Sequence, residues 1–316
     1  MTNDLKELLD LAKQSNRVSL AKLLSITERG GEKALQLTKL AFFHQTDSYL
    51  IGITGAPGAG KSTLANGLIA EVRKRALEVA VLAVDPTSPF SGGAILGDRV
   101  RMQGHSSDPG VYIRSMATRG HLGGLALAVP EAARVLSAVG FPYVLLETVG
   151  VGQVEVEIVE SADTTIVVVT PGWGDSVQAN KAGLMEIADI FVINKADRDG
   201  VRETRRDIES MLEMSGKNDW VPPVVESVAS RGDGVDKVFE AVLSHRSYLQ
   251  ESGQGLKIRQ ARLKNELKKI VEAQIDRRID QVLSDPQFYS KQQKLMQGEI
   301  DPYTLASELL NSLFQS

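Results

Sequence analysis

Between residues 48 and 252, short continuous apolar runs alternate with longer segments of helical periodicity. The runs predict strands at Tyr49–Thr54, Val79–Val84, Tyr143–Glu147, Thr165–Thr170, Ile190–Asn194 and Val224–Ser227. Helical spacing lies between them, for example over Lys61–Arg75 and Val235–Leu249. Nearly continuous apolar strands separated by helices are typical of a mostly parallel sheet covered on both faces. The pattern predicts an α/β fold, in which ligands bind beyond the carboxyl ends of the strands.

Both ends of the chain have helical patterns instead. Residues 1–47 place leucines at helical spacing, with a break at Gly30-Gly31 and a further short helix over Lys33–Phe43. We expect these residues to form a helical N-terminal extension in front of a domain at residues 48–252.

After this domain, residues 252–255 (Ser-Gly-Gln-Gly) predict a linker. A long helix is expected from about Ile258 to Leu283, and Asp301-Pro302 predicts the N-cap and first turn of a last helix. Residues 256–316 are therefore predicted to form a helical C-terminal arm.

Composition and charge exclude several classes of protein. The formal net charge is -4, so the chain lacks the positive excess that a global nucleic-acid binder needs to displace counterions from phosphates. It contains no cysteine, which excludes disulfides and thiolate metal sites. No apolar run approaches the roughly 20 residues of a membrane span, and the acidic first ten residues do not resemble a signal peptide. We expect a cytoplasmic protein that binds neither membranes nor nucleic acids.

A glycine-rich segment joins the first predicted strand to the helix that follows it. Its residues are Gly55, Ala56, Pro57, Gly58, Ala59, Gly60, Lys61 and Ser62, a full match to GxxxxGK[ST]. Glycines let the backbone approach phosphate oxygens closely, and the helix N-terminus points N–H groups at the anion. We expect Lys61 to contact the β- and γ-phosphates, Ser62 to bind Mg²⁺ and Thr63 to lie near the α-phosphate.

A second motif follows the strand Ile190–Asn194. Asn194, Lys195 and Asp197 form NKxD, the guanine-reading motif of GTPases. The aspartate can accept hydrogen bonds from the ring N–H and the exocyclic amine of guanine, whereas adenine offers neither donor on that edge. We expect the Lys195 stem to pack on the base and Asn194 to tie this pocket to the phosphate loop. The motif predicts GTP and GDP as ligands.

The segment after the next predicted strand contributes backbone groups to the same pocket. It consists of Val228, Ala229 and Ser230, whose amides are expected to face the guanine carbonyl. Many GTPases have serine where this chain has Val228, so only a backbone role is predicted.

Carboxylates at predicted strand ends are candidate magnesium ligands, because Mg²⁺ prefers hard oxygen donors. Asp85 and Glu147 each close a strand, and Asp98 lies in a glycine-rich loop where it could instead cap a helix. Glu147 and Lys61 are the candidate catalytic residues. Ras-type GTPases have DxxG and then a water-orienting glutamine, but this chain has ExxG and Val151. We therefore expect slow hydrolysis that a partner accelerates.

Together these residues resemble the MeaB/ArgK family, in the metallochaperone branch of P-loop GTPases. The matching stretches are residues 52–64, 81–102, 113–126, 147–158 and 171–197. The resemblance implies a chaperone of an adenosylcobalamin-dependent acyl-CoA mutase of the methylmalonyl-CoA mutase type, which gates cofactor loading and protects the mutase. It also places Asp85, Asp98 and Glu147 at magnesium and switch positions.

The resemblance further implies a signalling loop at Gly172–Lys181, with Asp175, Gln178 and Lys181 as its polar members. It implies a homodimer formed through the C-terminal arm. The apolar stripe at residues 258–283 agrees with dimerisation, although packing of this helix on its own domain would give the same pattern.

Three alternatives remain open at the level of sequence. A metal-insertion GTPase would carry Cys or His features that this chain lacks. A GTP- or ATP-dependent kinase of a transport-related protein would need an acceptor pocket. A binding module without hydrolysis would not need Lys61, Ser62 and Glu147.

Overall fold

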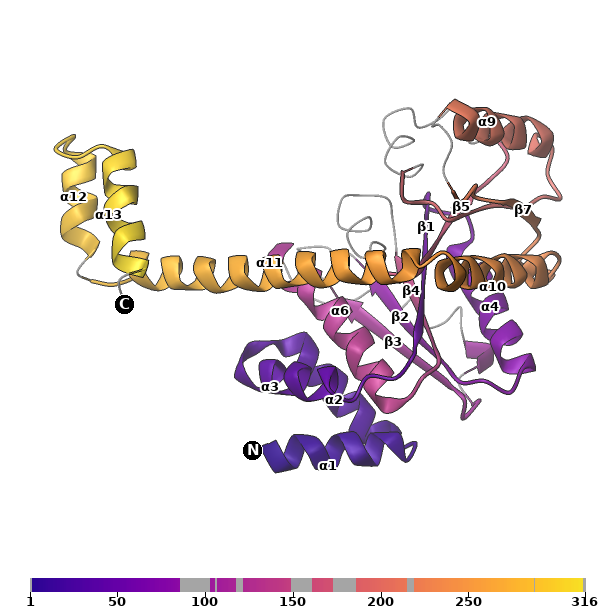
Figure 1. The fold of residues 1–316 in the computed structure, drawn as a ribbon, viewed down its shortest axis with the longest axis horizontal. Helices are drawn as coiled ribbons and strands as arrows, with labels where there is room; N and C mark the ends of the chain where they lie inside the picture. Colours follow the sequence, from indigo (N-terminus) through magenta and orange to yellow (C-terminus); the bar gives the residue numbers. More distant parts are fainter. Residues whose placement is uncertain are drawn as a thin grey trace. The chain divides into compact units, whose positions relative to one another are not determined.

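The computed structural model describes residues 2–85, 103–105, 107–117, 122–148, 161–172, 186–214, 219–286 and 288–314. These residues form a seven-stranded sheet in the order β3-β2-β4-β1-β5-β6-β7, and each neighbouring pair of strands is parallel (Figure 1). The strands are β1 (Tyr49–Gly55), β2 (Val79–Asp85), β3 (Val111–Ala117), β4 (Tyr143–Thr148), β5 (Thr164–Val169), β6 (Ile190–Asn194) and β7 (Val224–Ser227). The predicted α/β fold with a parallel sheet is confirmed.

Strand β3 was absent from the predicted set of strands. It pairs only with β2 and forms one edge of the sheet. Its central residues include Arg114, whose guanidinium makes an ion pair with Glu28. An edge strand with polar positions lacks the continuous apolar run that marks a strand buried on both faces.

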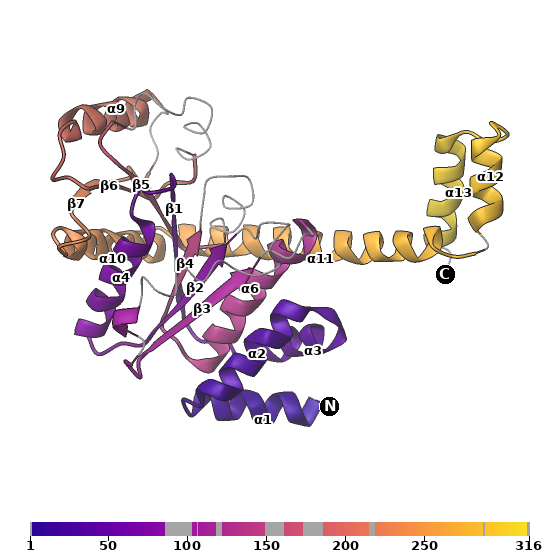
Figure 2. The ribbon, with the colours of Figure 1, turned by 180° about the vertical axis from the view of Figure 1, so that it is seen from behind.

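Helices cover both faces of the sheet, as the two opposite views show (Figures 1 and 2). Val79 and Val81 of β2 pack in a core with α4 and α10, while Ala80 and Leu82 face the opposite core, which contains α6. A further cluster packs α9 on β5 and β6. The bounds of these helices are α4 (Lys61–Lys74), α6 (Leu122–Val139), α9 (Val201–Met214) and α10 (Val235–Glu251), and a short 3-10 helix spans Gln103–His105.

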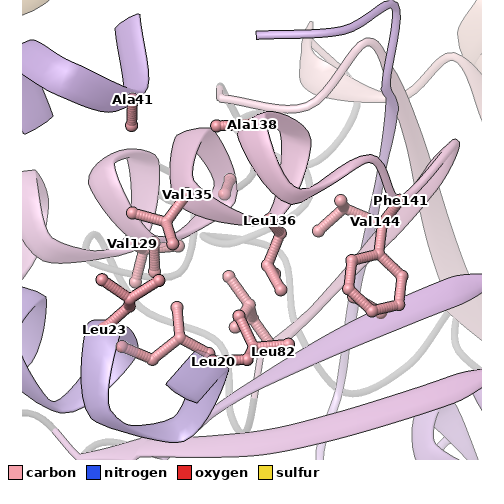
Figure 3. Packing of buried hydrophobic residues seen from close by; sticks show 14 of the residues in the cluster. Leu20, Leu23, Ala41, Leu82, Val129, Val135, Leu136, Ala138, Phe141 and Val144 are labelled. Carbon is pink, nitrogen blue, oxygen red and sulfur yellow. The ribbon is translucent and has the colours of Figure 1, made fainter. Parts of the chain in front are cut away.

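The N-terminal helices complete the core on the α6 face. Their bounds are α1 (Thr2–Lys13), α2 (Arg17–Arg29) and α3 (Gly31–Phe42). Figure 3 shows Leu20 and Leu23 of α2 in one cluster with Val129 and Leu136 of α6 and Leu82 of β2. The N-terminal extension therefore buries its apolar stripe against the sheet domain.

The chain divides into two compact units, Met1–Ile258 and Arg259–Ser316. Helix α10 is followed by α11 (Gln254–Leu283) after only two residues, so the predicted four-residue linker is too long. The turn needs few residues because Gly253 adopts a left-handed conformation with φ of 68°. None of the helices in the described ranges is long and apolar enough to cross a bilayer.

The C-terminal unit continues with α12 (Phe288–Met296) and α13 (Pro302–Phe314). The predicted cap of the last helix is confirmed, because Asp301 Oδ1 accepts from Tyr303 N at 2.9 Å and from Thr304 N at 3.0 Å. Helix α12 was not predicted. It is short, and none of its residues is buried, so its apolar pattern is weak.

Candidate functional site

The glycine-rich segment forms a tight loop between the carboxyl end of β1 and the N-terminus of α4. Gly55 has φ of 139°, and a Cβ at this position would lie 2.1 Å from the Val168 carbonyl oxygen of β5. Gly58 and Gly60 also have positive φ, at 75° and 94°. Only glycine fits this path without strain, which leaves the backbone open to a ligand at the helix N-terminus.

Lys61 and Ser62 open α4 and are both buried, with 7% of each residue exposed. Lys61 Nζ donates to the carbonyl oxygens of Gly55 at 2.7 Å and Ala56 at 3.2 Å. The ammonium group therefore lies over the loop itself. A phosphate bound in the loop would meet this charge at close range, where charge-assisted hydrogen bonds are strong.

Asn194 joins the phosphate loop to the turn that follows β6, as predicted. Its Nδ2 donates to the Ala59 carbonyl oxygen at 2.8 Å. A Cβ on Gly60 would lie 2.3 Å from the same nitrogen, so this contact requires glycine there. Lys195, with φ of 60°, adds a second link because its Nζ donates to the Gly58 carbonyl oxygen at 2.7 Å.

The other end of the Asn194 side chain holds the segment after β7. Its Oδ1 accepts from Ser227 Oγ at 3.2 Å and from Ala229 N at 3.0 Å. The Ala196 amide donates to the Ser227 carbonyl oxygen at 3.0 Å. Ser227 was not predicted as a site residue, and its only signal in the sequence is its place as the last residue of the strand before Val228.

The turn after β6 also carries the predicted base-reading carboxylate. Asp197 keeps 38% of its side chain exposed, and its Oδ2 lies 3.5 Å from Arg231 Nη2. Val228 closes the neighbouring turn, because its amide donates to the Asp233 carbonyl oxygen at 2.9 Å. Asp197 and the segment 228–230 thus lie on two turns that are bonded to each other, while Ser230 is exposed.

Two candidate magnesium ligands lie at the carboxyl ends of neighbouring strands. Glu147 of β4 is fully buried and pairs in register with Ile53 of β1, just before the phosphate loop. Asp85 is the last residue of β2, the strand on the other side of β4. Ser62, in the first turn of α4, follows the carboxyl end of the adjacent strand β1 through the phosphate loop.

Within the described ranges, no group of three or more His, Asp or Glu residues could hold a metal ion by itself.

Several predicted positions lie outside the described residues. They are Asp98, Val151, Asp175, Gln178 and Lys181. Among the described residues, the structure joins the NKxD turn to the phosphate loop, and it places Glu147 beside the strand that leads into that loop.

Comparison with known proteins identifies the family. The family model for methylmalonyl-CoA mutase-associated GTPase MeaB matches residues 20–284. A protein of Pyrococcus abyssi is 46% identical over 311 residues, 97% of this chain and 96% of that protein. GTPase ArgK of Escherichia coli is 35% identical over 280 residues, 86% of this chain and 85% of that protein. A crystal structure of LAO/AO transport system kinase matches with a TM-score of 0.72 and 25% identity, covering 99% of this chain and 98% of that one. The chain belongs to the MeaB family of methylmalonyl-CoA mutase-associated GTPases.

Proposed function

We propose that this chain is a magnesium-dependent GTPase that hydrolyses GTP to GDP and phosphate. The observation that carries the proposal is the Asn194 side chain, which bonds the phosphate loop at Ala59 and the segment after β7 at Ala229. These bonds fix the distance between a phosphate site and a base site. A rigid spacing of that kind suits a nucleotide, which must meet both sites at once.

In this proposal the phosphates lie against the backbone N–H groups of Gly55–Thr63 and the Lys61 ammonium group. Ser62, Asp85 and Glu147, with Asp98, are the residues that would hold Mg²⁺, which offsets charge on the β- and γ-phosphates when bound. Glu147 is buried beside the strand that leads into the phosphate loop, and its carboxylate oxygens are hard donors of the kind that Mg²⁺ prefers.

Guanine is read by Asp197 at the outer end of the site, with the Lys195 stem against the base. Ala229 N already donates to Asn194, so the exposed Ser230 amide is the better placed of the two for the guanine carbonyl. Adenine presents no donors to this carboxylate, so ATP is expected to bind more weakly than GTP.

We further propose that hydrolysis is slow until a partner completes the site. The support is the sequence, because Val151 stands where Ras-type enzymes have a water-orienting glutamine. The description of the matched family names methylmalonyl-CoA mutase, which supports an adenosylcobalamin-dependent acyl-CoA mutase as that partner. The GTPase would then act as its chaperone and gate loading of its cofactor, with the loop at residues 172–181 as the signalling segment.

The client can be tested with label at the γ-phosphate of GTP. Purified protein with Mg²⁺ is expected to release labelled phosphate slowly, and a purified methylmalonyl-CoA mutase is expected to raise the rate several-fold. The Lys61→Ala variant in the same mixture measures contaminating hydrolysis. A rate of phosphate release that the mutase does not change would point to another client. Transfer of the label to a protein would instead indicate a kinase.

For the quaternary state we propose a homodimer formed through residues 256–316. All of α11 lies in the described ranges, yet none of its residues is buried, and Leu263, Leu267 and Val271 are 42%, 62% and 46% exposed. Such an apolar stripe is expected to find a partner surface. A chain ending at residue 255 is expected to be monomeric by light scattering, and a dimer that survives the truncation would place the interface elsewhere.

A further inference from the structure

Three contacts join the two turns that form the base site. Ala196 N donates to the Ser227 carbonyl oxygen at 3.0 Å. Asn194 Oδ1 accepts from Ala229 N, also at 3.0 Å. The third link joins Asp197 to Arg231 at 3.5 Å. This third link is the one that involves the base-reading carboxylate itself.

The carboxylate of Asp197 has one side-chain partner in this link. Among the residues that the structure describes, Arg231 is the only hydrogen-bond donor to its carboxylate. A carboxylate accepts about four hydrogen bonds, and the guanine edge supplies two donors, so an arginine can share the group with the base. Val228, in the neighbouring turn, has no hydroxyl with which to hold the carboxylate.

Arg231 is well suited to this role because its backbone is fixed. Its amide donates to the Val228 carbonyl oxygen at 2.8 Å, and the Val228 amide donates to Asp233 O at 2.9 Å. The turn ends at Gly234, with φ of 74°, where a Cβ would lie 2.3 Å from the Glu226 carbonyl oxygen. The guanidinium group therefore extends from a tightly defined turn toward Asp197.

We propose that Arg231 is a positioning residue for guanine recognition. It holds the Asp197 carboxylate so that both oxygens face the ring N–H and the exocyclic amine of guanine. This inference rests on the proposed function, because it assumes that Asp197 reads guanine.

The contact also predicts which substitutions are tolerated. A single guanidinium nitrogen reaches a single carboxylate oxygen, so the pair lacks the two-point geometry that only arginine can make. Lysine at this position can therefore take over the contact. Because 66% of the Arg231 side chain is exposed, the contribution of this contact to GTP binding is expected to be modest and to decline at high salt.

The test compares equilibrium binding of GTP and of ITP, whose base lacks the exocyclic amine and so makes one of the two bonds to Asp197. Arg231→Ala is expected to weaken GTP binding by roughly three- to ten-fold, the size expected when one side chain must be ordered on binding. The affinity for ITP is expected to fall by a smaller factor, so the ratio of GTP affinity to ITP affinity decreases. Arg231→Lys is expected to keep the ratio.

Arg205→Ala is the control, because this partly exposed arginine pairs with Glu226 at 2.9 Å and Glu209 at 3.4 Å and does not contact Asp197. Tighter GTP binding by Arg231→Ala would overturn the proposal and make Arg231 a competitor of the base. An equal loss of affinity for GTP and ITP would mean that Arg231 supports folding of the turn and not base recognition. Unchanged affinities would show that Arg231 has no role in recognition.

The outcome for the unchanged protein separates this inference from the function on which it rests. If the protein binds GTP no better than ATP, the proposed function itself fails. If the unchanged protein prefers GTP but Arg231→Ala has the same GTP:ITP affinity ratio as the control, the GTPase proposal stands and the positioning role is wrong.

Discussion

A Lys61→Ala variant is expected to bind GTP roughly 100-fold more weakly, or worse, because it loses a buried cation that faces the phosphates. The ammonium group already lies within 2.7 Å of Gly55 O and is thus placed inside the loop. The backbone N–H groups and the guanine contacts would remain in the variant. Residual binding is therefore expected to keep its preference for guanine while losing most of its strength.

Lys74→Ala provides the matched control at the other end of the same helix. The Lys74 side chain is 69% exposed and pairs with Glu71, far from the helix N-terminus. Titration calorimetry with GTP and Mg²⁺ is expected to give this variant the affinity of the unchanged protein. A Lys61→Ala variant that folds and binds GTP with unaltered affinity would refute the phosphate-loop assignment.

The central strands could be predicted from sequence because they are buried on both faces. Strands β1, β2, β4, β5 and β6 each lie between two other strands, and their mostly buried side chains give nearly continuous apolar runs. Strand β3 could not be found in the same way, because Arg114 and Ser115 interrupt its run at the sheet edge. Burial on both faces does not account for β7, which was predicted although it forms the opposite edge of the sheet and is only partly buried.

The motifs of the site were also predictable, because each is a continuous segment with its chemistry in fixed spacing. Ser227 and Arg231 were not, since their roles come from contacts with Asn194 and Asp197, residues more than 30 positions away in the chain. A serine after a strand or an arginine in a turn has no local pattern that marks it. Only the folded arrangement of β6 beside β7 brings these side chains together.

An Asp197→Asn variant is expected to exchange guanine for xanthine. Asparagine offers one acceptor and one donor, whereas the guanine edge presents two donors, so its amide faces the exocyclic amine without a bond. Xanthine has a carbonyl in place of that amine and matches asparagine on both atoms. GTP binding is expected to fall by roughly 100-fold, the combined cost of a lost bidentate contact and an unpaired donor.

Asp199→Asn is the control, because it makes the same chemical change at an exposed position two residues further along the same turn. It is expected to leave the order of GTP over XTP unchanged. Both variants keep the phosphate loop, so a difference between their relative affinities for GTP and XTP comes from recognition of the base.

The affinity ratio of XTP to GTP, measured for the Asp197→Asn variant beside the unchanged protein, tests the central claim most directly. The guanine-site account predicts that the unchanged protein prefers GTP and that the variant prefers XTP. A variant that still prefers GTP would show that Asp197 does not read the base, and the assignment of this site to guanine nucleotides would be wrong.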